Sequence, residues 1–262
     1  MHASETSAAD PTALFERLYA TDLVYQPDCW KLCGDAHCCS FARHKARFKI
    51  LARGSGQDLP LLSGEFEFLE ANGWQMQFQD FIRHRQLYDF GPGTLVYDSV
   101  SSRRPRCACD HDTRTVVCRL YPLLPVFDID GRLAGTEVIG VYEELEQLEG
   151  IAPACQIAAL PFEQMNLFLR LCELLASDPV LLFHLAAYRT AKRHVFGRLA
   201  EARTGNGKSA FALFEGAFLR RRLFDHAALK AELAGLYGTF EKRYGHRFAG
   251  GMAQLHTPRE TA

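Results

Sequence analysis

The sequence predicts an α+β protein in which a loop-rich cysteine-cluster metal domain with short strands is followed by a helical C-terminal half. Three observations predict this fold class. Seven of the nine cysteines form two groups in the first half of the chain, where short strand patterns alternate with turn signals and short helical patterns. Apolar stripes at helical spacing dominate the second half. With 262 residues, of which 48% are hydrophobic, the chain is long enough to bury a sizeable core.

The composition of the chain changes near residues 150–160, where we place a soft boundary. We expect a disordered N-terminus at residues 1–10, a cysteine-cluster metal-binding domain at residues 11–154, a helical region at residues 155–249 and a disordered tail at residues 250–262. Both ends consist of polar or small residues, which is typical of frayed termini.

The first elements are short helices and a cysteine-rich loop. Helical spacing of apolar residues predicts a helix that begins at Pro11. Residues 29–40 are rich in Cys, Gly and Asp and should form a loop around metal ligands, whereas residues 41–51 look helical and basic. Ser63 is a suitable N-cap for a further helix with two glutamates in its first turn, and the Asn-Gly pair that follows ends it.

Strand patterns follow this helix. Residues 74–81 alternate between apolar and polar side chains, which predicts a half-buried strand, and residues 94–100 predict another. The clearest β structure is a hairpin in which residues 125–129 run into an Asp-Gly turn and residues 138–142 form the return strand. The two aspartates of Asp128-Ile129-Asp130-Gly131 are therefore turn residues rather than ligands of a hard cation.

Three helical patterns follow the hairpin. The first helix covers residues 161–177, and its predicted apolar face consists of Phe162, Met165, Leu169 and Cys172. Asp178 and Pro179 are typical of a helix start, with Asp as the cap and Pro in the first turn. The last apolar stripe consists of Leu229, Leu233, Leu236, Tyr237, Phe240 and Tyr244.

Charge and hydropathy favour a cytoplasmic protein. The net charge of −1 gives no reason to expect specific nucleic-acid binding. Residues 189–222 carry nine Lys or Arg against Glu201 and Glu215, which indicates either a solvated helix face or a docking surface for an acidic partner. The N-terminus lacks a secretory pattern, and every apolar stretch is shorter than the roughly 20 residues of a membrane span. We therefore expect no membrane contact.

The two cysteine groups predict a metal site. Their members are Cys29, Cys33, Cys38 and Cys39 in the first group and Cys107, Cys109 and Cys118 in the second. Closely spaced thiolates converge on one soft metal ion or cluster, and in the reducing cytoplasm clustered thiols bind metal more often than they form disulfides. Metal-free redox thiols are the third alternative. The isolated Cys155 and Cys172 are expected to be core residues.

The spacing ranks the ligands and the metals. The preferred ligand set is Cys29, Cys33, Cys38 or Cys39, and Cys118, with Cys109 next. Paired Cys-x-x-Cys knuckles, which zinc sites usually show, are missing from the sequence, and Ala36 interrupts the pattern of radical S-adenosylmethionine enzymes. The irregular spacing therefore favours an iron-sulfur cluster of the 4Fe-4S type, with zinc as the alternative.

Histidines and arginines accompany both cysteine groups. His37 and His111 either substitute as ligands, shape the surroundings of the metal, or are ordinary loop residues. Arg104 and Arg119 stand beside the thiols and either offset the charge of a thiolate-bound cluster or are simply solvated.

The segment CWKLCGDAHCC, followed at a distance by CACDHDTRTVVCRLYPLLP, resembles the YkgJ-type cysteine-cluster family of zinc- or iron-chelating domains. The resemblance covers about residues 29–125, and its closing Cys-Arg-x-x-Pro motif is present at residues 118–122. The opening cysteines are spaced more widely than in the family. The resemblance implies a metal-chelating domain. A flagellin lysine N-methylase carries a similar cysteine cluster, so a modifying enzyme is a second function that the resemblance leaves open.

We therefore expect a cysteine-ligated metal-binding protein whose iron-sulfur cluster supports modification of a protein or peptide substrate. The alternative is a non-catalytic interaction module in which structural zinc staples the loops and the basic helical face binds an acidic partner. The usual hydrolytic motifs are missing from the sequence. Residues 203–209 end like a phosphate-binding loop, but Ala202 occupies the place of the required first glycine, so we expect a loop between helices.

Overall fold

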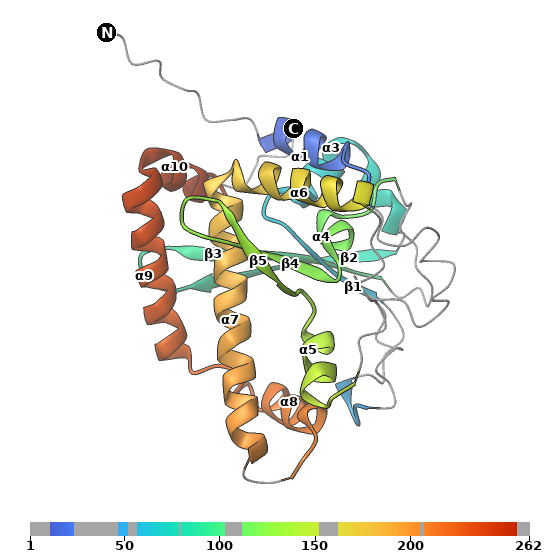
Figure 1. The fold of residues 1–262 in the computed structure, drawn as a ribbon, viewed down its shortest axis with the longest axis vertical. Coiled ribbons are helices and arrows are strands. Elements are labelled where there is room, and N and C mark those ends of the chain that lie inside the picture. The colour runs from blue at the N-terminus through green and yellow to red at the C-terminus, as the bar shows by residue number, and fades with distance from the viewer. Residues whose placement is uncertain are drawn as a thin grey trace.

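The computed structural model describes residues 11–23, 47–51, 57–78, 80–102, 112–151, 162–204 and 207–255. Within these ranges the fold is α+β, as predicted, with two small antiparallel sheets and surrounding helices (Figure 1). The sequence-predicted loop at residues 29–40 and the predicted disordered N-terminus lie outside them.

Five strands form the two sheets. The strands are β1 (Gln57–Leu61), β2 (Phe81–Asp89), β3 (Thr94–Ser102), β4 (Leu123–Phe127) and β5 (Leu133–Val138). The first sheet has the order β1-β3-β2, and Val100 of β3 faces Leu59 on one side and Arg83 on the other. The second sheet is the β4-β5 hairpin, in which Leu124 is paired with Glu137.

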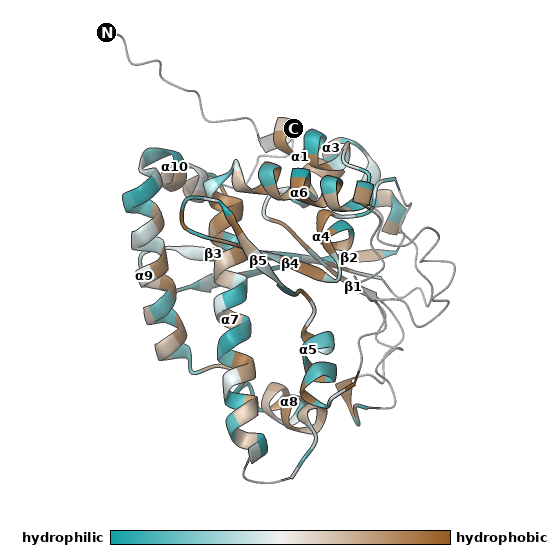
Figure 2. Ribbon diagram, in the orientation of Figure 1, coloured by the Kyte–Doolittle hydropathy of each residue, from teal (hydrophilic) through white to brown (hydrophobic). Residues whose placement is uncertain are grey.

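Helices surround the sheets at both ends and along one side (Figure 1). In chain order they are α1 (Pro11–Tyr19), α3 (Glu65–Ala71), the 3-10 helix η4 (Trp74–Phe78), α4 (Val116–Leu120), α5 (Val141–Leu148), α6 (Phe162–Ala176), α7 (Pro179–Thr204), α8 (Ala210–Leu219), α9 (His226–Tyr244) and α10 (His246–Gln254). Helices α1, α3 and α6 lie at one end and α5 and α8 at the other, whereas α7 runs beside α9. Figure 2 shows hydrophobic residues predominating in the first turns of α7 and hydrophilic residues following them.

One β prediction is confirmed, one is confirmed in part and one is wrong. The strand at residues 94–100 is β3, and the hairpin is present, with two turn N–H groups donating to the Asp128 carboxylate. Its return strand is Leu133–Val138, so the prediction of residues 138–142 is wrong beyond Val138, and Val141 already begins α5. The predicted strand at residues 74–81 is instead η4. Within η4, Trp74 and Phe78 pack against the core, and this spacing of four is helical rather than alternating. Phe81, the last residue of the predicted strand, also packs against the core but begins β2.

The helix predictions are mostly right in position and less so in detail. The helix predicted after Ser63 is α3, but its N-cap is Gly64 with φ of +84°, and the Ser63 hydroxyl donates to the carbonyl of Val96 instead. Asp178 caps α7 as predicted and accepts from two N–H groups of its first turn. Residues 47–50 form a turn and a bend, so the helix predicted at residues 41–51 is wrong over these residues.

The buried face of α6 differs from the prediction. Phe162 is 75% exposed, and Met165 and Leu169 are also exposed, whereas Cys172 is buried as expected. The residues that face the core are Phe168, Leu171, Cys172, Leu174 and Leu175. The helix packs against both α1 and α7, so its contact face is rotated from the predicted stripe.

The first of three hydrophobic clusters in the described residues crosses the predicted domain boundary. It joins α1, α3, both sheets and α4 to α6 and the start of α7. A second cluster lies between α7, α9 and α10, and it confirms the predicted apolar stripe of α9. Helix α10 continues to Gln254 with Met252 buried, so the prediction of a disordered tail is wrong for residues 250–254.

No single helix in the described ranges is both long and apolar enough to cross a bilayer, and α6 and α7 reach that length and composition only jointly, across a bend of 106°.

Candidate functional site

Cys118 is the one member of the two cysteine groups that lies within the described residues. It belongs to α4, where the hydroxyl of the N-cap Thr115 accepts a hydrogen bond of 3.4 Å from the Cys118 N–H. The other predicted ligands, Cys29, Cys33, Cys38, Cys39, Cys107 and Cys109, lie outside the described residues, as do His37, His111, Arg104 and Cys155. The described residues alone contain no group of three side chains able to hold a metal ion.

A fully buried carboxylate, Glu65, fixes the start of α4 to the rest of the core. Its oxygens accept hydrogen bonds from the Val116 N–H at 2.6 Å, from the Leu62 N–H at 2.8 Å and from the Tyr19 hydroxyl at 2.8 Å. Desolvation raises the pKa of Glu65, and these donors together with Arg119 oppose that rise. One side chain thereby joins α1, α3 and the helix that carries Cys118.

Two buried arginines tie together chain segments that are far apart in the sequence. The guanidinium of Arg119, which is 1% exposed, donates to the carbonyls of Thr21 at 2.7 Å, Asp112 at 2.6 Å and Arg114 at 3.1 Å. Arg114 in turn donates to the carbonyl of Leu23. Desolvation lowers the pKa of Arg119, with repulsion from Arg114 as the next cause. The four carbonyls therefore hold two buried cations beside Cys118.

The positions of these carbonyls relate the two cysteine groups to each other. Leu23 is followed by residues 24–46, which contain the whole first group, and Asp112 follows residues 103–111, which contain Cys107 and Cys109. The two arginines thus fasten the start of one cysteine segment to the end of the other. Both anchoring points are bonded to Arg114 or Arg119, and Arg119 follows Cys118 in α4.

The far end of the first cysteine segment is held by another carboxylate. Glu215 of α8 accepts hydrogen bonds from the N–H groups of Lys49 at 3.1 Å, Ile50 at 2.6 Å and Leu51 at 2.9 Å. Although desolvation opposes ionisation, these three donors lower the pKa of Glu215. The chain that leaves residues 24–46 is therefore fixed to the helical half.

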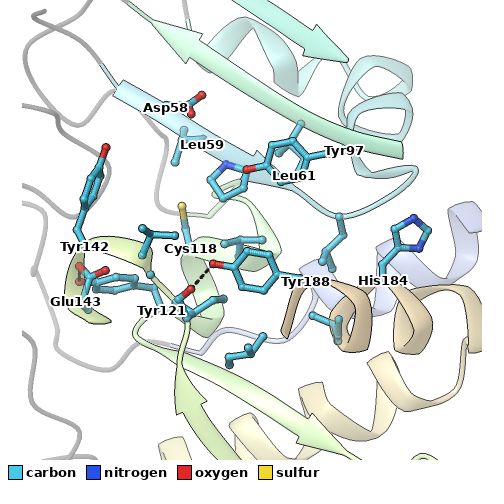
Figure 3. A pocket seen from close by; sticks show the side chains of 18 of the residues that line it. Asp58, Leu59, Leu61, Tyr97, Cys118, Tyr121, Tyr142, Glu143, His184 and Tyr188 are labelled. Carbon is cyan, nitrogen blue, oxygen red and sulfur yellow. Dashed lines mark hydrogen bonds between the residues drawn. The ribbon is translucent and has the colours of Figure 1, made fainter. Parts of the chain in front are cut away.

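Cys118 lines a cavity of about 450 Å³ (Figure 3). The walls come from β1, β3, α4, the β5-α5 turn, α7 and α8, so they combine elements on both sides of the predicted domain boundary. Most of the lining surface is apolar. A cavity of this size and character is typical of small-molecule or side-chain binding sites.

Tyrosine is the commonest polar residue of the cavity, which is also lined by Ser63 and His184. Four of them, Tyr97, Tyr121, Tyr142 and Tyr188, come from different parts of the chain. The Tyr188 hydroxyl donates to the carbonyl of Ile139 at 2.5 Å. Burial raises the pKa of Tyr142 to about 12, and nearby carboxylates add to this rise. Burial also raises the pKa values of Tyr97 and Tyr188. These phenols are therefore protonated at neutral pH.

Two carboxylates complete the cavity. Glu143 accepts a hydrogen bond of 2.5 Å from the Tyr121 hydroxyl, and its carboxylate lies directly against Gly140, where an added Cβ would meet Oε2 at 1.6 Å. Desolvation raises the pKa of Asp58, and a hydrogen bond with Ser99 and the charge of His84 offset only part of that rise. Among the described residues that line the cavity there is no Lys or Arg.

The sequence analysis did not identify these cavity residues. Asp58, Tyr97, Glu143 and Tyr188 form no local motif, because the fold assembles them from β1, β3, α5 and α7. The one usable signal was Tyr121, which lies inside the Cys-Arg-x-x-Pro motif that also contains Cys118.

The basic segment at residues 189–222 is partly neutralised. Lys192 is buried and forms an ion pair of 2.8 Å with Glu144. Arg189 is paired with Glu137 at 2.6 Å, and Arg193 with Glu232 at 2.5 Å. Three of the nine basic residues therefore face carboxylates from other elements, and Lys192 does not belong to a solvated helix face. A second cavity, of about 610 Å³, lies beside α7 and α9 and contains no cysteine among its described lining residues.

Comparison with known proteins found no family model, curated protein or solved structure that matches the chain. The resemblance to YkgJ-type proteins therefore depends on the cysteine motif alone and stays a prediction.

Proposed function

We propose that this protein holds a cysteine-ligated metal centre, an iron-sulfur cluster of the 4Fe-4S type, that supports modification of a protein or peptide at the neighbouring cavity. The ligands are drawn from Cys29, Cys33, Cys38, Cys39, Cys107, Cys109 and Cys118. The observation that carries this proposal is that Cys118 lies on the wall of a preformed cavity. A purely structural site with four closed ligands has no need of such a cavity.

The described surroundings of Cys118 suit a thiolate-bound cluster in two respects. The buried guanidinium groups of Arg114 and Arg119 place positive charge where several thiolates would bring negative charge. Their hydrogen bonds to Thr21, Leu23 and Asp112 tie the flanks of both cysteine segments to α4 and to Arg114 just before it. A cluster bound there would supply one-electron chemistry.

The chain's own residues suit a substrate site. The tyrosine hydroxyls of the cavity can orient a polar group, its apolar walls exclude water, and Glu143 or Asp58 can accept a proton from a bound group. The interaction module with structural zinc is the competing proposal. The ion pairs of Arg189, Lys192 and Arg193 weaken it, because they reduce the positive charge offered to an acidic partner.

The test is the metal and acid-labile sulfide content of protein purified without oxygen, together with its absorption spectrum. We expect iron and sulfide in comparable amounts and broad visible absorption. Colourless protein that contains one zinc ion per chain would contradict the cluster and make the zinc-stapled interaction module the better account.

A further inference from the structure

We propose that the C-terminal end of α8 and the three arginines that follow it dock on an anionic lipid surface. The docking patch consists of Ile50, Phe218, Leu219, Arg220, Arg221 and Arg222. This inference goes beyond the proposed function and does not depend on the metal centre. It rests on the apolar and the charged side chains that this end of the molecule exposes.

The docking patch exposes large apolar side chains on a helix that is hydrophobic almost throughout. Ile50 is 51% exposed, Phe218 48% and Leu219 47%. In Figure 2 the colours of hydrophobic residues predominate along α8, whose one charged residue is the buried Glu215. Exposed apolar side chains that are grouped in this way mark a contact surface.

The exposed side chains stand on a fixed base. The Glu215 carboxylate accepts a hydrogen bond of 2.6 Å from the Ile50 N–H, which holds Ile50 beside α8. The ring of Phe218 stacks on the ring of the buried Phe214, with 6.2 Å between the centroids and an interplanar angle of 21°. Figure 1 shows α8 at the end of the molecule that lies away from α10. The docking patch is therefore placed to meet an extended surface.

Arginines border the apolar side chains. Arg220, Arg221 and Arg222 are all exposed, and within the described part of the chain no carboxylate forms an ion pair with them, in contrast to the paired arginines of α7. The carboxylate of Glu215 accepts from three N–H groups. The next acidic residue, Asp225, accepts from two N–H groups at the start of α9. The docking patch thus presents positive charge to its surroundings.

Apolar side chains next to unpaired cations favour a lipid surface over an acidic protein. Each basic residue near an anionic bilayer strengthens binding by about fivefold, and apolar side chains beside it can enter the headgroup region. An acidic protein would satisfy the arginines, but it would need a pocket shaped for each apolar side chain, whereas acyl chains adapt to them. The expectation of no membrane contact concerned spanning segments, and docking at the surface needs none.

The primary test is cosedimentation with phosphatidylcholine vesicles that contain about 30% phosphatidylserine, and with vesicles of phosphatidylcholine alone. We expect the anionic vesicles to bind at least about tenfold more tightly, and this binding to weaken about tenfold as salt rises from about 0.1 M to about 0.5 M. Replacing Arg220, Arg221 and Arg222 together with Gln should weaken binding at least about tenfold. Replacing all three with Lys keeps the charge and should preserve binding.

A second pair of variants distinguishes a lipid surface from an acidic protein. Phe218 also lines the cavity beside Cys118, so these variants use the other two apolar side chains of the docking patch. Ile50→Ser and Leu219→Ser should each weaken vesicle binding about fivefold, because less apolar surface enters the bilayer. Neither should change the binding of polyglutamate, a soluble acidic probe.

The matched control replaces Lys242, Arg243 and Arg247 together with Gln. It removes three exposed charges from α9 and α10 at the other end of the molecule and should leave vesicle affinity unchanged. Thermal unfolding confirms that each variant is folded. Absence of binding to anionic vesicles, equal binding to both vesicle types, or wild-type affinity in the triple Gln variant of the docking patch would overturn the inference. Wild-type vesicle affinity in both Ser variants would also overturn it and would identify an acidic protein as the better partner.

Discussion

Replacing Arg119 with Met should destabilise the protein strongly, because the arginine is a buried cation that joins three chain segments. The substitution keeps an apolar stem of similar length but removes donors to the carbonyls of Thr21, Asp112 and Arg114. It also leaves the buried carboxylate of Glu65 without the favourable charge of Arg119.

The size of the loss follows from these contacts. Hydrogen bonds to a charged donor contribute about 1.5–3 kcal/mol each, but removing the guanidinium also removes its own desolvation cost. Breaking a buried ionic arrangement from one side typically costs about 3–5 kcal/mol. For a chain of this size that corresponds to a decrease in Tm of roughly 6–20 °C. The flanks of the cysteine segments would also lose their common anchor, so we expect a lower iron content per folded chain.

The assay is thermal unfolding of wild type, Arg119→Met and a control, Arg243→Met. The control breaks a 2.7 Å ion pair with Asp130 in which the Arg243 side chain is 54% exposed, and such surface pairs contribute about 0.2–1 kcal/mol. A decrease in Tm for Arg119→Met no larger than that of the control, with iron content equal to wild type, would refute the anchoring role.

Two further predictions follow from buried or crowded carboxylates. Glu215→Gln should lower the free energy of unfolding by about 2–3 kcal/mol at neutral pH. Because the pKa of Glu215 is lowered in the folded state, its contribution to stability is present above the unfolded pKa of about 4.3 and is lost as pH falls through the folded value. A stability difference between wild type and Glu215→Gln that persists below the folded pKa would contradict the role of this carboxylate. Gly140→Ala should displace the Glu143 carboxylate from Tyr121 and lower stability by about 1–2 kcal/mol in urea unfolding, whereas an unchanged midpoint would show that the carboxylate moves at no cost.

The sequence predicted those parts of the fold whose signals are local. Asp178 and Pro179 start α7 because capping depends on neighbouring residues, and the Asp-Gly turn at residues 130–131 forms the hairpin for the same reason. The alternation at residues 74–81 was misleading because Trp74 and Phe78 of η4 pack against the core whereas Met76 between them is 66% exposed. The sequence pattern alone did not decide between a helical and a strand period at these residues.

The candidate site was predictable only at its cysteines. The motif around Cys118 predicted a metal ligand, and the structure places this residue on a cavity wall, but the cavity itself depends on tertiary packing. Tyr97 of β3 and Tyr188 of α7 line the same cavity, and no sequence motif encodes that arrangement. Glu65 was assigned to a helix start for its charge, whereas in the fold it is fully buried and joins three elements.

The most direct test of the metal centre compares Cys118→Ser with Cys172→Ala after purification without oxygen. Cys172 is a matched control because it is 2% exposed in the hydrophobic core, where burial raises its pKa to about 12. The account predicts that Cys118→Ser loses iron and sulfide or changes the visible absorption, while Cys172→Ala keeps the wild-type iron-to-protein ratio. Wild-type iron and sulfide in Cys118→Ser, or no bound iron in the wild type itself, would contradict a cluster ligated at the cavity wall.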